Sequence, residues 1–102
     1  MIYVLATITL APGKRADFVA EFQRNVPNVL AEDGCLEYGP AIDVETTIPA
    51  QGPPRPDVVV VVEKWADIAA LEAHLIAPHM LTYRAKVKDM VQGVSLQVLK
   101  PA

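Results

Sequence analysis

Five consecutive valines, Val58–Val62, constrain the fold of this 102-residue chain more than any other segment. Valine is branched at Cβ, which restricts its side chain in helices and favours extended strands. Because successive side chains of a strand point to opposite faces, a strand through these valines is apolar on both faces. Such a strand must be covered on both sides, whereas an antiparallel sheet often leaves one face in water.

Apolar spacing and turn residues divide the rest of the chain into strands and helices. They predict strands over Ile2–Leu10, 35–45, 57–65 and 94–99, and helices over 14–31 and from 66 to about 92. Pro78 should interrupt the second helix, and Gly93 should end it. We expect a bend at Gly39-Pro40 and a long proline-rich connection over 46–56.

The predicted element order is β-α-β-β-α-β, the split βαβ arrangement of ferredoxin-like α+β folds. Four antiparallel strands then carry the helices on one face, in a single domain over residues 1–102. That arrangement leaves the other face of the valine strand bare. Hydrophobic residues make up 52% of the chain, although a small domain, with its large relative surface, should need few of them. We therefore predict a homodimer in which a second sheet covers the bare face.

Charge and composition argue against several other kinds of partner: nucleic acid, a membrane, a cofactor and a metal ion. The net charge is -3 with no block of basic residues, which argues against nucleic acid because phosphate neutralisation dominates its binding. No apolar run approaches the roughly 20 residues that cross a bilayer. The chain opens directly on strand-like sequence and Cys35 is its only cysteine, so we expect a cytoplasmic protein. Its scattered glycines form no nucleotide-binding motif and its histidines lack zinc-ligand spacing, so we expect no cofactor and no metal.

The most informative motifs lie in the segment Glu63–Met80. A strand ends in Trp65, a helix follows with the sequence Leu-Glu-Ala-His that ends at His74, and the pair Pro78-His79 comes next. A strand end, a helix start and a proline break together bring polar and aromatic side chains to one apolar cleft.

With Pro12–Lys14 and Asp33–Tyr38 in the same order, these motifs resemble the antibiotic biosynthesis monooxygenase family over nearly the whole chain. The resemblance implies a ferredoxin-like monomer that pairs into a dimeric α+β barrel, with a pocket between sheet and helices. The better understood members are cofactor-independent oxygenases of polyphenols or quinols; others isomerise small oxygenated metabolites or degrade haem.

The leading expectation is therefore a cofactor-free monooxygenase of an aromatic, quinol-like small molecule. An isomerase or related enzyme of a small oxygenated metabolite and a non-catalytic, dimeric small-molecule-binding module are the alternatives. The chain departs from the family in two places. Similar oxygenases carry asparagine where this chain has Val61, and haem-degrading members carry one in the first strand, which here offers Thr7 and Thr9.

Five residues are candidates for the site. His74 can accept a phenolic proton as a neutral imidazole, and Arg84 can hold the resulting oxyanion; these two are the predicted catalytic residues. Trp65 is predicted to stack on a planar substrate, with His79 and Tyr83 as further substrate-binding residues. Each also has an ordinary structural interpretation: a core tryptophan, a hydrogen-bonded histidine at a helix–sheet seam, a packed tyrosine or a solvated arginine.

Overall fold

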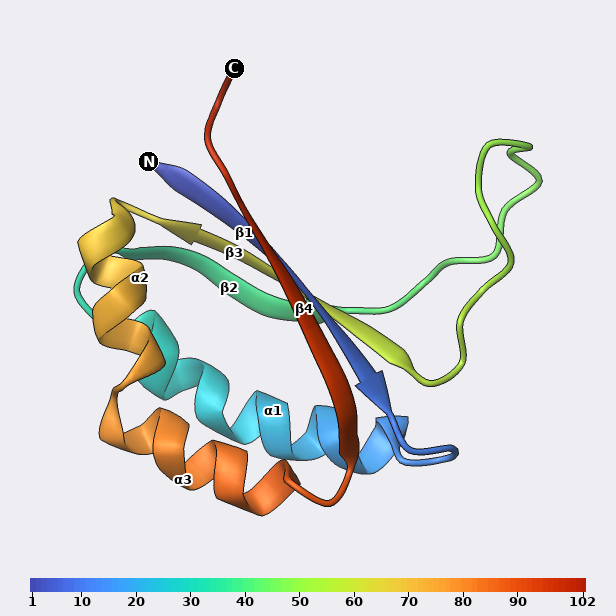
Figure 1. The fold of residues 1–102 in the computed structure, drawn as a ribbon, viewed down its shortest axis with the longest axis horizontal. Helices are drawn as coiled ribbons and strands as arrows, with labels where there is room; N and C mark the ends of the chain where they lie inside the picture. Colours follow the sequence, from blue (N-terminus) through green and yellow to red (C-terminus); the bar gives the residue numbers. More distant parts are fainter.

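The computed structural model describes residues 1–102 and is drawn in Figure 1. Its seven elements follow one another as β1 (Ile2–Leu10), α1 (Arg15–Leu30), β2 (Cys35–Ala41), β3 (Val58–Trp65), α2 (Ile68–Leu75), α3 (Pro78–Val87) and β4 (Val91–Leu99). The predicted second helix is thus two helices, divided as expected before Pro78. The α+β class and the ferredoxin-like order of strands and helices are confirmed.

The four strands form one antiparallel sheet in the order β2-β3-β1-β4. Alternate residues of the two central strands point toward the helices and are buried, among them Val4, Val59 and Val61. All three helices lie on this side of the sheet (Figure 1). The core therefore sits between the sheet and the helices.

The start of α2 is fixed by its cap. The Asp67 carboxylate accepts a hydrogen bond from the backbone N–H of Ala70 at 2.8 Å, which satisfies one of the free donors of the first turn. Leu71 of this helix is buried, whereas Ile76, which follows the helix, is exposed. His74, three residues after Leu71, shares the buried face instead.

Several details of the predicted boundaries are wrong. The strand predicted over 35–45 ends at Ala41, where its pairing with β3 stops. The irregularity of β2 lies between Cys35 and Glu37 rather than at Gly39-Pro40, which pair regularly with β3; proline is tolerated there because β2 is an edge strand. The last helix ends at Val87 rather than at Gly93. Gly93 lies inside β4, because pairing with β1 continues to the end of that strand.

The other face of the sheet carries no helix. Its centre includes Leu5 and Val62, which lie opposite each other on β1 and β3 and are 41% and 36% exposed. The connection from residue 42 to residue 57 extends away from the body (Figure 1), and the Asp43 carboxylate holds it together by accepting hydrogen bonds from Arg55. The structure contains no helix that is both long and apolar enough to span a membrane.

Candidate active site

An apolar pocket of about 400 Å³ opens between α3 and the strands β1 and β4. Of the 16 residues that line it, 12 are hydrophobic. The other four are all ionisable: Glu63, His74, Arg84 and Lys88. Small-molecule sites commonly have this composition, an apolar lining with a few polar groups that orient the ligand.

His74 reaches the pocket from α2 and is almost fully buried. Its Nδ1 lies 2.8 Å from Oε2 of Glu32, just after α1. A carboxylate can only accept, so Nδ1 carries the hydrogen, and Nε2, which has no partner in the protein, remains an acceptor. Burial lowers the pKa of His74, opposed by the hydrogen bond and charge of Glu32, while the charges of Arg84 and His79 lower it further. The pocket thus holds a neutral imidazole with a free acceptor nitrogen.

Glu63 comes from β3, on the strand face that points to the helices. Its Oε1 accepts a hydrogen bond from Nε1 of Trp65 at 2.8 Å. Burial raises the pKa of Glu63 to about 7, with a smaller contribution from the charge of Glu32 and against the lowering effect of the Trp65 hydrogen bond. Near neutral pH this carboxyl group therefore exchanges readily between its acid and its carboxylate form.

Trp65 does not line the pocket. Its side chain is fully buried, and its ring lies beside that of His74 with centroids 4.7 Å apart. The tryptophan thus supports two pocket residues, by donating to Glu63 and by packing on His74. Its ring offers no exposed face on which a substrate could stack.

Arg84 and Tyr83, both on α3, line the pocket as the sequence predicted. Burial raises the pKa of Tyr83, and it raises that of Tyr38 on the opposite wall as well. Both phenols therefore stay protonated at neutral pH and can donate hydrogen bonds. Val61, where similar oxygenases carry asparagine, also lines the pocket, so this departure falls in the pocket wall itself.

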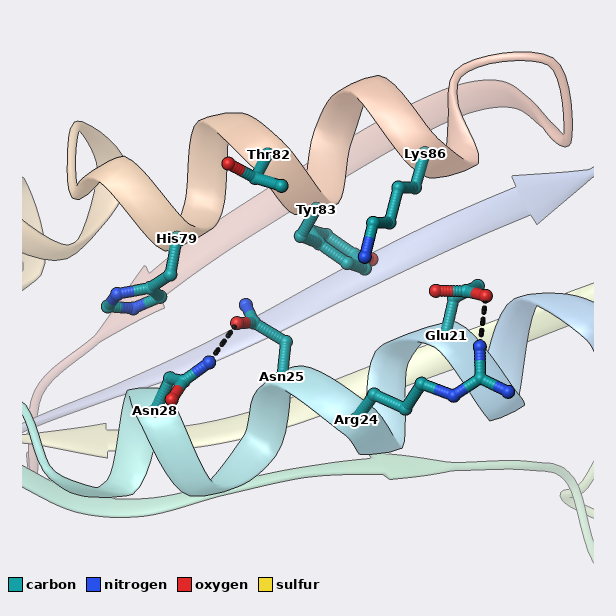
Figure 2. Close-up of a pocket in the computed structure, with 8 residues that line it drawn as sticks. All are labelled: Glu21, Arg24, Asn25, Asn28, His79, Thr82, Tyr83 and Lys86. Atoms are coloured by element: carbon teal, nitrogen blue, oxygen red, sulfur yellow. Dashed lines mark hydrogen bonds and ion pairs between the residues drawn. The ribbon is translucent and has the colours of Figure 1, made fainter.

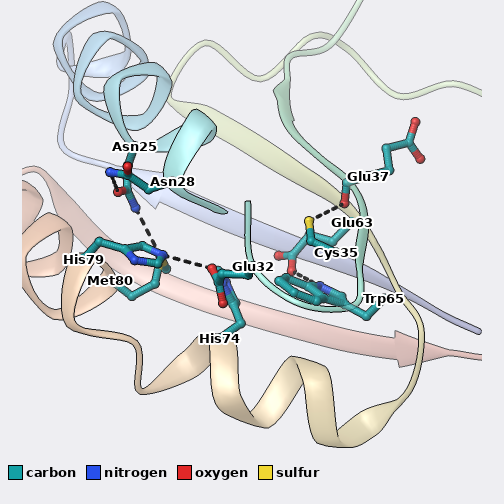
Figure 3. A network of polar contacts seen from close by, with 10 residues as sticks. All are labelled: Asn25, Asn28, Glu32, Cys35, Glu37, Glu63, Trp65, His74, His79 and Met80. Atoms are coloured by element: carbon teal, nitrogen blue, oxygen red, sulfur yellow. Dashed lines mark hydrogen bonds and ion pairs between the residues drawn. The ribbon is translucent and has the colours of Figure 1, made fainter. Parts of the chain in front are cut away.

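His79 lies in a different hollow, a polar groove of about 210 Å³ between α1 and α3. Figure 2 shows it at one end, with Asn25 and Asn28 of α1 opposite. Its Nε2 nevertheless lies 2.9 Å from Oε2 of Glu32, the oxygen that His74 also contacts. Figure 3 shows both histidines converging on this carboxylate.

The structure thus brings three of the predicted residues, His74, Tyr83 and Arg84, to one pocket and places the other two behind or beside it. Sequence reasoning missed Glu63 and Glu32. The signal for Glu63 was the strand period, which puts a carboxylate between two buried residues of the inward face of β3. Glu32 gave no such signal, because its partners are more than 40 residues away. No group of three or more His, Cys, Asp or Glu is placed to share a metal ion.

The family model described as antibiotic biosynthesis monooxygenase matches residues 1–86. The chain belongs to that family. The probable quinol monooxygenase YgiN of Escherichia coli K12 is 39% identical to it over 103 residues, which cover 99% of this chain and 98% of that protein. The family and this relative both belong to the monooxygenases, so the reaction class of this chain is that of a monooxygenase, an oxidoreductase.

Solved structures agree with the fold of this family member. A protein from Pseudomonas aeruginosa is similar with a TM-score of 0.81 and 29% identity, covering 99% of this chain and 93% of its own. A protein from Mycobacterium tuberculosis has a TM-score of 0.79 and 26% identity, covering 99% and 94%. The resemblance seen in the sequence is thereby confirmed.

Proposed function

We propose that this monooxygenase oxidises a quinol-like aromatic substrate without a cofactor, in the apolar pocket. The observation that carries the proposal is the neutral His74, which lines the same apolar space as the cationic Arg84 and whose Nε2 has no partner in the protein. A phenol bound there meets a proton acceptor and a partner for its oxyanion at once. The name of the relative YgiN supports the choice of a quinol.

The reaction needs no external reductant when the substrate is a hydroquinone. Its hydroxyl proton moves to Nε2 of His74, and the anion left behind is electron-rich enough to reduce O₂. One oxygen atom enters the ring and the other leaves as water, so hydroquinone and O₂ give hydroxyquinone and water. All electrons come from the substrate, and the proton on His74 leaves with the water. The protein supplies the base, the oxyanion partner and the apolar surroundings that strengthen both.

A proton-shuttling isomerase is the second candidate. What favours it is a second proton-transfer group in the same pocket, because the pKa of Glu63 is about 7. One group can remove a proton from a small oxygenated metabolite while the other returns it at a second carbon. Such a reaction consumes no oxygen, which separates it from the first candidate.

The test is oxygen uptake with purified protein dialysed against a chelator. We expect enzyme-dependent uptake with 1,4-hydroquinone or 1,4-naphthohydroquinone, above their autoxidation, and none with naphthalene, which has no hydroxyl to deprotonate. His74→Ala should lower turnover by about 10²-fold or more, the range for losing a general base. Glu72→Gln, an exposed change on the same helix, is the matched control. Uptake unaffected by His74→Ala, or restored only by an added metal or flavin, would contradict the proposal.

We also propose that the active form is a homodimer in the cytoplasm. Support for the dimer is the bare outer face of the sheet, where Leu5 and Val62 are exposed side by side. A second sheet on this face would cover the outward side of the valine strand. The cytoplasmic assignment rests on the single free cysteine, which suits a reducing compartment.

A further inference from the structure

Glu32 makes an unusual pair of contacts outside the pocket. One of its two carboxylate oxygens, Oε2, lies within hydrogen-bond distance of both histidines. The three side chains come from three places: His74 from α2, Glu32 from the turn after α1, and His79 from the first turn of α3. The break at Pro78 between α2 and α3 lets two histidines five residues apart approach the same carboxylate.

The exposure of the side chains increases from His74 through Glu32 to His79. The exposed fraction of the side chain is 2% for His74, 14% for Glu32 and 26% for His79. His74 lines the apolar pocket, whereas His79 lines the polar groove. Glu32 therefore lies between the reacting space and the solvent-filled side of the molecule.

We infer that Glu32 is the positioning residue of His74: it holds Nδ1–H, so that the bare Nε2 faces the substrate, and His79 in turn holds Glu32. The inference rests on the proposed function for its chemical meaning and deepens it. An imidazole has two neutral tautomers, and only the one protonated at Nδ1 can accept a substrate proton at Nε2. A carboxylate at Nδ1 selects that tautomer and stabilises the imidazolium that forms after proton transfer.

His79 contributes by restricting the conformation of the Glu32 side chain. A glutamate side chain next to a turn has three rotatable bonds, and a single contact to His74 would leave it free to rotate away. A second N–H donor on the same oxygen, at 2.9 Å, restricts the carboxylate to the position in which it serves His74. Trp65 restricts the other side of the His74 ring by packing against it.

Several charged or titratable groups surround His74, so the pH dependence of turnover would report on all of them together. Glu32 faces it from the turn after α1, Arg84 and His79 from α3, Tyr38 from β2, and Glu63 shares its pocket from β3. Only Glu32 among them contacts a ring nitrogen. The test therefore begins with a readout of that nitrogen alone.

The first measurement is the ¹⁵N NMR spectrum of the histidine side chains in the free protein, which needs no substrate. We expect His74 protonated at Nδ1 in wild type, and a mixture of tautomers in Glu32→Gln, whose amide no longer selects one. Glu32→Asp should keep part of the wild-type tautomer, and Glu72→Gln should keep all of it. Wild-type His74 protonated at Nε2, or an unchanged tautomer in Glu32→Gln, would overturn the inference.

The second measurement is oxygen uptake with the hydroquinone that wild type converts. Glu32→Gln should lower kcat by about tenfold or more with little change in KM, because it alters proton transfer and leaves the pocket walls in place. His79→Ala should have a smaller effect in the same direction, and circular dichroism checks that each variant is folded. Equal kcat in wild type and Glu32→Gln would count against the inference. If wild type takes up no oxygen but its His74 tautomer depends on Glu32, the proposed substrate is wrong and the positioning stands.

Discussion

At the scale of single residues, the site depends on burial rather than on unusual side chains. Glu63 is an ordinary glutamate whose carboxyl group lies in an apolar wall, and that burial raises its pKa to about 7. His74 is an ordinary histidine whose burial lowers its pKa. The same desolvation therefore raises the pKa of the acid toward neutral pH and lowers the pKa of the base, because burial disfavours the charged form of each group.

The raised pKa of Glu63 predicts a pH-dependent stability. The ordinary value is 4.5, so the folded protein binds this proton more tightly than the unfolded chain does. The stabilisation is complete below pH 4.5 and is lost as the pH rises through about 7; the gap corresponds to roughly 3 kcal/mol. Glu63→Gln removes this titration but keeps an oxygen for Trp65.

Urea unfolding between pH 4.5 and 8 checks this prediction. His74 has the opposite sign, because its lowered pKa makes protonation at low pH destabilising, but it is present in both proteins. The difference between wild type and Glu63→Gln therefore isolates the glutamate, and wild type should lose more stability as the pH rises. Two parallel curves would show that Glu63 is not buried as its protonated form.

Single residues show most clearly which parts of the site could be predicted from the sequence. His74, Tyr83 and Arg84 could be predicted as pocket residues because each sits near an apolar stripe of a helix. For Trp65 the sequence left a stacking role and a core position open, because the His74 ring that packs on it comes from another element. Glu32 could not be predicted, since its role exists only after three separate segments have packed together.

At the scale of elements, the strands were easier to predict than their ends. Alternation located β1 to the residue, and Pro78 marked the division of the second helical segment. The end of α3 and the start of β4 were missed because the apolar residues Met90 and Val91 suit a helix as well as a strand. What decides between them is the pairing of Val91 with Leu10 of β1, a contact that local sequence does not contain.

Gly34 controls how β2 begins beside α2. Its φ is +80°, and a Cβ placed there would lie 2.7 Å from Cβ of Ala70. Its carbonyl oxygen also accepts a hydrogen bond from Ala66 just before α2. Gly34→Ala should lower the free energy of unfolding by about 2–3 kcal/mol, combining left-handed strain with a steric clash.

Gly13→Ala is the matched control, because Gly13 has a φ of +78° with open space around it. It should cost only the backbone strain, about 1 kcal/mol. Thermal or urea unfolding of both variants separates the two effects. Equal losses would mean that the close approach of the β2 start to α2 contributes nothing.

At the scale of the whole molecule, one face of the sheet is left uncovered in the isolated chain. The helices cover one face of the sheet, and only 18 of 102 residues are buried in the isolated chain. Apolar side chains remain exposed at the centre of the other face, where Leu5 and Val62 are paired across β1 and β3. Large exposed apolar patches on small domains are typical of interaction surfaces.

The last prediction is that a second copy covers this face. Sedimentation at micromolar concentration should give twice the chain mass of 11.1 kDa, because a second sheet would cover the apolar side chains exposed on this face. Val62→Lys places a charge at the centre of the face and should shift the protein toward monomer, while Ile48→Lys adds the same charge to an exposed apolar residue of the 42–57 connection and should leave the mass unchanged. A wild-type protein that sediments as a stable monomer would contradict the prediction, and so would a dimer that Ile48→Lys dissociates but Val62→Lys does not. The second result would move the interface from the sheet to the extended connection.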